Sequence, residues 1–175
     1  MIRSLLVLAF VALIEGCAAS ALPLLPSQLS ESVALSSTAG SVLFPTIGGY
    51  GGTFRYSASN APAGTTATVT TIANPTAGLV PGPPPPGTML VAFEFTLDRS
   101  VKFADWFFLL TTITIPSSLA TNGHTFDEYG YDLTQGVGGG YNIGTVQGTM
   151  ISFGQGLGPV TLLGNHTYLV VLTMR

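Results

Sequence analysis

The chain has 175 residues, of which only 7% are charged, and its formal net charge is −3 at pH 7. After residue 21 the only cationic residues are Arg55, Arg99, Lys102 and Arg175. They are too few and too scattered to form a surface that follows the phosphates of a nucleic acid. Hydrophobic residues make up 46% of the chain, which excludes a disordered protein. The lone cysteine, Cys17, excludes an intrachain disulfide as a source of stability.

Residues 1–21 have the features of a secretory signal peptide. One cation, Arg3, precedes an apolar run over 5–14, and small residues follow that run. This order is typical of an export signal, and the run is too short to span a bilayer. A cut after the triplet at 19–21 would release a freely secreted chain that begins at Leu22.

The sequence around Cys17 offers a second cleavage site. Residues 14–17, Ile-Glu-Gly-Cys, resemble the lipobox of bacterial lipoproteins. The resemblance implies a signal over 1–16, acylation of Cys17 and stable anchoring in a membrane. Ala18 as the following residue implies the outer membrane. We therefore expect a lipid-anchored protein of the cell envelope, with free secretion as the alternative.

Residues 22–40 are dominated by Ser and Ala, contain two prolines and show no sustained period. This composition is typical of a spacer, so we expect a flexible tether here and a folded domain over 41–175. An N-terminal strand is the alternative for part of this segment. The Pro-rich run over 81–87 lacks backbone donors at four consecutive positions, which predicts a stiff, exposed connector.

From residue 41 onward, hydrophobic residues recur with the two-residue period of β-strands. The period is clearest over 91–98, and the final strand is apolar on both faces, which predicts a central position in its sheet. Gln147-Gly148 and Gly164-Asn165 predict tight turns. Together with the strand at 91–98 and the final strand at 167–173, the predicted strands lie at 53–57, 66–71, 107–115, 125–133, 141–146, 149–153 and 160–163, between Gly, Pro or Asn residues.

Eight or nine short strands predict an all-β fold with a single antiparallel β-sandwich of jelly-roll or immunoglobulin-like type, and a closed barrel is the alternative. The last 50 residues or so resemble the closing strands of secreted bacterial β-sandwich modules of jelly-roll or galactose-binding-like type. The resemblance rests on the acidic and aromatic segment 126–132, a Gly-rich loop, a hairpin that ends at residue 153, and the turn at 164–168 before a hydrophobic strand. It implies an extracellular accessory or surface domain.

The densest group of oxygen ligands is the acidic trio Asp127, Glu128 and Asp132. Calcium takes six to eight oxygen ligands, so a calcium site is one hypothesis for the trio. In an extended segment, however, Glu128 and Asp132 share one face and Asp127 points to the other. The competing interpretation is that all three are solvated carboxylates that discourage pairing at a sheet edge.

Tyrosine and tryptophan side chains suggest a surface on which sugar rings could stack, because they join a flat apolar face to a polar tip. Tyr131 and Tyr141 are the best candidates, since they flank the Gly-rich segment 136–140. Tyr129, Trp106 and Tyr50 complete the set, although Trp106 lies in an aromatic run that is typical of a buried core.

Catalysis has little support in the sequence. No Ser lies in a nucleophile-elbow motif, and a Ser117–His124–Asp127 triad or a pairing of Glu94 with Glu128 or Asp132 uses residues that are common in loops and strands. We therefore expect a non-catalytic surface or binding module without a cofactor, whose partners are the membrane through a lipid anchor and a glycan or an envelope protein. A glycan- or calcium-binding accessory domain is the alternative, followed by a self-assembling surface subunit, which the low charge suits, and an envelope hydrolase.

Overall fold

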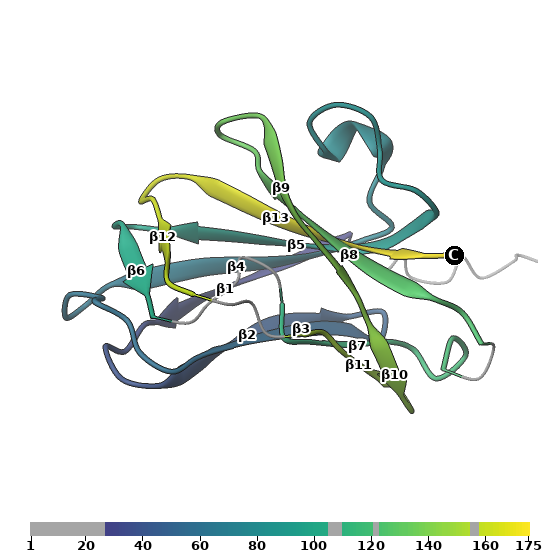
Figure 1. The fold of residues 1–175 in the computed structure, drawn as a ribbon, viewed down its shortest axis with the longest axis horizontal. Helices are drawn as coiled ribbons and strands as arrows, with labels where there is room; N and C mark the ends of the chain where they lie inside the picture. Colours follow the sequence, from purple (N-terminus) through teal and green to yellow (C-terminus); the bar gives the residue numbers. More distant parts are fainter. Residues whose placement is uncertain (1–26, 105–109, 121–122, 155–157) are drawn as a thin grey trace, which may run out of the picture.

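A computed structural model describes residues 27–104, 110–120, 123–154 and 158–175 of the chain. Two antiparallel sheets pack face to face in it (Figure 1). The larger sheet has six strands, in the order β1 (Gln28–Ala34), β4 (Thr66–Ala73), β5 (Thr88–Leu97), β13 (Thr167–Met174), β8 (Phe126–Asp132) and β9 (Val137–Ile143).

The smaller sheet has five strands, in the order β10 (Thr145–Gln147), β11 (Met150–Ser152), β7 (Thr112–Thr114), β3 (Tyr50–Tyr56) and β2 (Gly40–Ile47). A two-stranded ladder of β6 (Val101–Phe103) and β12 (Val160–Leu162) lies at one end of the sandwich (Figure 1). The sheets do not close into a barrel, so the sandwich prediction is confirmed. No helix of the described residues is long and apolar enough to cross a bilayer.

The main core lies between the two sheets. Alternate residues of β5 point into it, and Val91, Phe93, Phe95 and Leu97 are almost completely buried, as their spacing predicts. Aromatic rings of the two sheets meet edge to face, with centroids 5.3 Å apart for both Phe44–Phe93 and Phe54–Phe95. The final strand, β13, is central in its sheet, as predicted.

A second, smaller cluster covers the other face of the six-stranded sheet. The β4–β5 connection, which contains the short 3-10 helix η1 (Ala77–Leu79), folds over this face (Figure 1). Val80 is buried there with Ala92, Leu169 and Val171. The Pro-rich run is mostly exposed, as expected, except that Pro85 is buried. The β4–β5 loop therefore covers part of the outer face of the sheet as well as connecting the two strands.

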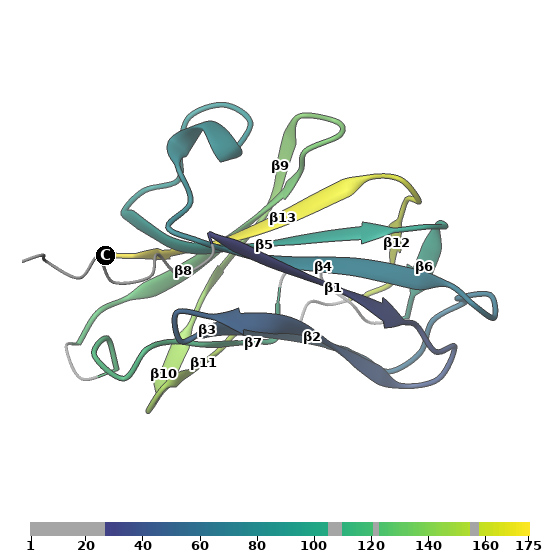
Figure 2. The ribbon, with the colours of Figure 1, turned by 180° about the vertical axis from the view of Figure 1, so that it is seen from behind.

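The expected tether at 22–40 is wrong from Gln28 onward. Residues Gln28–Ala34 form β1, which pairs with β4 from Gln28 opposite Ile72 to Ala34 opposite Thr66. Figure 2 shows β1 at the edge of the large sheet. Most of its side chains are exposed, so the strand is held mainly by backbone pairing and lacks the alternation that would reveal it.

The strand predicted at 141–146 is broken by a corner. β9 ends at Ile143 in the large sheet and β10 begins at Thr145 in the small sheet, so the chain changes sheets at Gly144. A Cβ atom at Gly144 would overlap the Ile151 side chain, so only glycine fits this corner. Of the strand predicted at 107–115, the described residues show Thr112–Thr114 as β7.

Candidate functional site

Cross-strand pairing sorts the candidate residues of β8 onto the two faces of the large sheet. Glu128 is opposite Leu172, which belongs to the main core, whereas Tyr129 is opposite Val171, which belongs to the second cluster. Because side chains alternate along a strand, the residues of β8 divide as the sequence predicts. Asp127, Tyr129 and Tyr131 point outward, and Glu128 and Asp132 point toward the small sheet.

Four residues on the outer face form a connected group that we call the tyrosine patch: Asp127, Tyr129, Tyr141 and Arg175. Tyr129 and Tyr141 are directly opposite each other on β8 and β9, and their ring centroids are 5.0 Å apart. The Tyr141 hydroxyl donates a hydrogen bond to Asp127 Oδ1 (3.2 Å). The Arg175 guanidinium forms an ion pair through Nε with Asp127 Oδ2 and reaches the Tyr141 hydroxyl through Nη2 (3.4 Å).

The end of β13 places the arginine of the patch. Arg175 follows β13 and exchanges two backbone hydrogen bonds with Thr125, just before β8. Its side chain therefore lies beside Asp127, whose carboxylate is completely buried. A buried carboxylate is costly unless it is paired, and Arg175 and Tyr141 supply that pairing.

The electrostatics of the patch keep Tyr129 neutral and Arg175 charged. Burial raises the pKa of Tyr129, and the negative charge of Asp127 raises it further. The hydrogen bond to Asp127, together with its charge, raises the pKa of Arg175. At neutral pH the patch therefore offers phenol and guanidinium donors beside an aromatic surface, with the charges of Asp127 and Arg175 balanced.

The other aromatic candidates do not join the patch. Tyr131 is only 8% exposed and packs in the second cluster, so its ring is covered. Tyr50 lies on β3 of the small sheet. Trp106 and Cys17 lie outside the described residues.

The acidic trio does not form a calcium site. All three carboxylates are buried, and β8 lies between β13 and β9, so the alternative of solvated edge carboxylates is wrong as well. Each has its own environment: Asp127 lies in the tyrosine patch, Glu128 in the main core and Asp132 beside His166. Within the described ranges, no group of three or more His, Cys, Asp or Glu side chains is placed to hold a metal ion.

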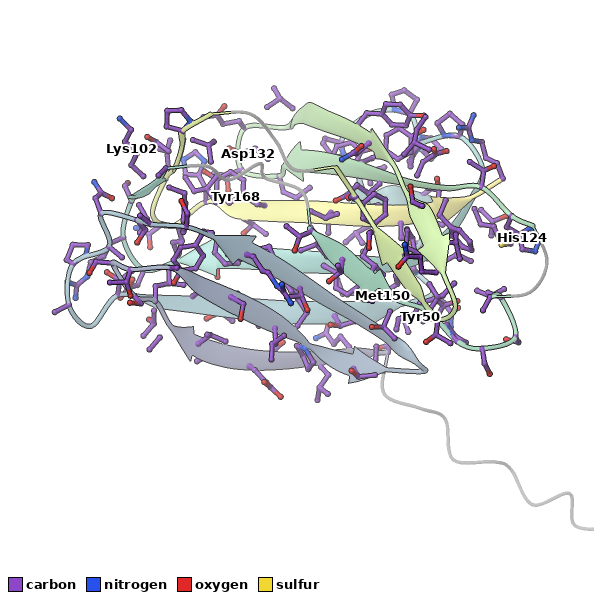
Figure 3. All side chains as sticks on the ribbon, turned by 60° about the horizontal axis from the view of Figure 1, so that its bottom comes forward. Tyr50, Lys102, His124, Asp132, Met150 and Tyr168 are labelled. Carbon is purple, nitrogen blue, oxygen red and sulfur yellow. The ribbon has the colours of Figure 1, made fainter. Side chains whose placement is uncertain are left out.

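Asp132 fixes the end of β8. Its Oδ1 accepts hydrogen bonds from the backbone N–H groups of Thr134 and Gln135, both at 3.0 Å, and its Oδ2 lies 2.9 Å from His166 Nδ1. The His166 ring stacks on Tyr168 with a centroid distance of 6.1 Å. Figure 3 shows Asp132 and Tyr168 at the end of the sandwich opposite His124 and Tyr50.

These placements separate the catalytic groupings drawn from the sequence. Asp127 is engaged by Tyr141 and Arg175, and the His124 ring packs against Phe126 at 6.3 Å. Glu94 is opposite Leu169 and therefore shares the outer face, whereas Glu128 and Asp132 are on the inner face. Two carboxylates on opposite faces of one sheet cannot flank a common glycosidic bond.

Sequence reasoning did not identify Arg175 and His166, which contact the candidate residues Asp127 and Asp132. No local signal identifies them, because each contact depends on β13 lying next to β8. Comparisons of the chain with models of known protein families, with curated proteins and with solved structures gave no match.

Proposed function

We propose that this protein is an exported, non-catalytic binding module of the bacterial cell envelope, and that it binds carbohydrate on the tyrosine patch. The observation that carries the proposal is the state of Tyr141. Tyr141 is 47% exposed, yet the ring of Tyr129 and the hydrogen bond to buried Asp127 hold its side chain in place. A fixed aromatic surface loses little conformational entropy when a ligand stacks on it.

The surroundings of Tyr141 suit a sugar ring. Ile143, which is more than half exposed and shares the outer face with Tyr141 and Asp127, extends the apolar surface. The Arg175 side chain is 45% exposed, and only part of its five N–H donors is used by Asp127 and Tyr141. A carbohydrate could therefore place an apolar face on Tyr141 and direct hydroxyl groups to the guanidinium.

The location of the module is proposed from the first 21 residues. Their order of one cation, an apolar run and small residues supports export, and Cys17 at the end of the run supports a lipid anchor. An anchored β-sandwich would present the tyrosine patch at a membrane surface.

Binding to immobilised oligosaccharides tests the ligand. We expect Tyr141→Ala to weaken binding at least tenfold, because it removes the stacking surface. Tyr141→Phe should weaken binding only a few-fold, because the ring stays and only the hydroxyl contacts with Asp127 and Arg175 are lost. Leu43→Ala is the matched control, since Leu43 is an exposed hydrophobic residue on β2 of the other sheet. Equal binding by the wild-type protein and Tyr141→Ala, or capture of an envelope protein in place of a glycan, would contradict this assignment.

Processing of the full-length chain tests the location. In a bacterial host, we expect the intact mass of the membrane-bound protein to match a chain that begins at acylated Cys17. Cys17→Ser should abolish the acylated species and release the protein from the membrane. A mass that matches a chain starting at Leu22 would show free secretion and remove the anchor from the proposal.

A further inference from the structure

A groove of about 560 Å³ opens between the two sheets at one end of the sandwich, and it is lined by residues outside the tyrosine patch. This volume lies within the range of about 300–1,000 Å³ that is typical of small-molecule sites. Its walls come from separate segments: Ser27 before β1, Ile47 and Tyr50 around the β2–β3 turn, Asn74 after β4, and Pro116 and Ser118 after β7. Figure 3 shows Tyr50 at this end of the small sheet.

The frame of the groove is built from constrained backbone. Gly48 and Gly49 have φ of 59° and 87°, which form the tight β2–β3 turn, and Gly49 packs against Pro116. Asn74 has φ of 51° and donates its backbone N–H to the Leu90 carbonyl (3.3 Å). The Ala73 N–H donates to the Ser27 carbonyl (2.9 Å), which ties the two segments of the large sheet together. The groove is therefore preformed.

The chemistry of the lining is polar but uncharged. Ile47, Pro116 and the half-buried ring of Tyr50 give apolar surface. Among the described residues that line the groove there is no Asp, Glu, Lys, Arg or His. Within the part of the chain that the structure describes, no hydrogen bond uses the side chains of Ser27, Tyr50 or Asn74, so their donors and acceptors are open to a ligand. Burial raises the pKa of Tyr50, which keeps its hydroxyl protonated.

We infer that this groove binds a single neutral sugar ring, of the size of a hexopyranose. A charged ligand would lose its hydration without meeting an opposite charge, and a wholly apolar ligand would leave the hydroxyl and amide groups of the lining without partners. A neutral sugar avoids both costs, because its apolar face fits the Tyr50 ring and its hydroxyl groups fit Ser27 and Asn74. The inference is independent of the tyrosine patch.

An NMR titration tests whether the groove binds a neutral sugar. Amide chemical shifts of the full mature protein are followed as methyl glycosides of glucose, galactose, mannose or N-acetylglucosamine are added. We expect saturable shifts at Gly48, Gly49 and Asn74 with at least one of these sugars at concentrations up to about 50 mM, where even a millimolar site fills. Asn74→Gly should weaken binding about fivefold to tenfold, because glycine keeps the positive φ and removes the side chain that carries the amide. Tyr50→Phe should weaken it a few-fold, since the ring remains.

Tyr141→Ala is the control, and it should leave the groove titration unchanged. Shifts at residues 141–143 report the tyrosine patch in the same spectra, so the groove and the patch succeed or fail separately. Absence of saturable shifts with every neutral sugar, or unchanged binding in both Asn74→Gly and Tyr50→Phe, would overturn the inference. Equally tight binding of glucuronate would overturn the assignment to neutral sugars.

Discussion

At the scale of single residues, Glu128 is the side chain whose environment makes the stability of the protein depend on pH. Its carboxyl group is fully buried; Oε1 accepts the backbone N–H of Leu110 at 2.6 Å, and Oε2 has no hydrogen-bond partner among the described residues. Burial raises the pKa of Glu128 well above its ordinary value, and the Leu110 hydrogen bond opposes this only in part. The carboxyl group is therefore held neutral in the core, where it satisfies a backbone donor that apolar side chains could not.

The raised pKa of the buried Glu128 carboxyl group predicts that the stability of the protein depends on pH. Because the folded pKa lies above the unfolded pKa of about 4.5, the folded protein binds more protons between the two values. The contribution of Glu128 is fully present below about pH 4.5 and is lost as the pH rises toward the folded pKa, at up to about 1.4 kcal/mol per pH unit. Glu128→Gln keeps the shape and cannot titrate, so we expect the difference in unfolding free energy between wild type and variant to shift in favour of the variant as pH rises.

Urea unfolding over a pH series measures this difference. Glu31→Gln is the matched control, because Glu31 is exposed on β1 and its replacement removes one carboxylate without touching the core. Parallel pH profiles for the wild-type protein and Glu128→Gln would show that Glu128 keeps the same proton affinity on folding, and would refute the prediction.

At the scale of the elements, the strands that could be predicted are those with one face in the core. β5 and β8 direct alternate side chains toward the small sheet, and the positions of these strands and the directions of their side chains follow from the period of two. The turns at Gly148 and Asn165 were predictable as well, because both residues adopt positive φ, 60° and 62°. β1 escaped prediction because an edge strand with mostly exposed side chains carries no such period.

The candidate site was only partly predictable, and the reason is topological. Tyr129 and Tyr141 could be identified as candidates from their types and from the Gly-rich loop between them. Arg175 lies 34 residues after Tyr141 in the chain, and it reaches Tyr141 only because β13 lies beside β8. Likewise, the sequence suggested one acidic cluster at 127–132, but the pleat of β8 and the partners of each carboxylate divide it into three unrelated environments.

At the scale of the whole molecule, stability must come from apolar layers more than from charge. The six-stranded sheet is buried on one face by the small sheet and is covered in part on the other by the β4–β5 loop, so apolar side chains pack on both of its faces. Among the described residues the contacts between acidic and basic side chains are few: Asp98–Arg99, Asp127–Arg175 and the Asp132–His166 contact. The first is exposed, and the other two involve largely buried carboxylates that salt screens poorly.

Salt should therefore act on this protein mainly through apolar hydration. We expect sodium chloride, raised to about 1 M, to change the unfolding free energy by less than about 1 kcal/mol, because it has few exposed ion pairs to screen. Sodium sulfate at equal ionic strength should stabilise the protein clearly, since sulfate is excluded from the surface and strengthens burial. Urea unfolding in the two salts measures both effects. A loss of several kcal/mol in chloride would show that screened charge interactions, rather than the two apolar layers, dominate the stability, and would contradict this prediction.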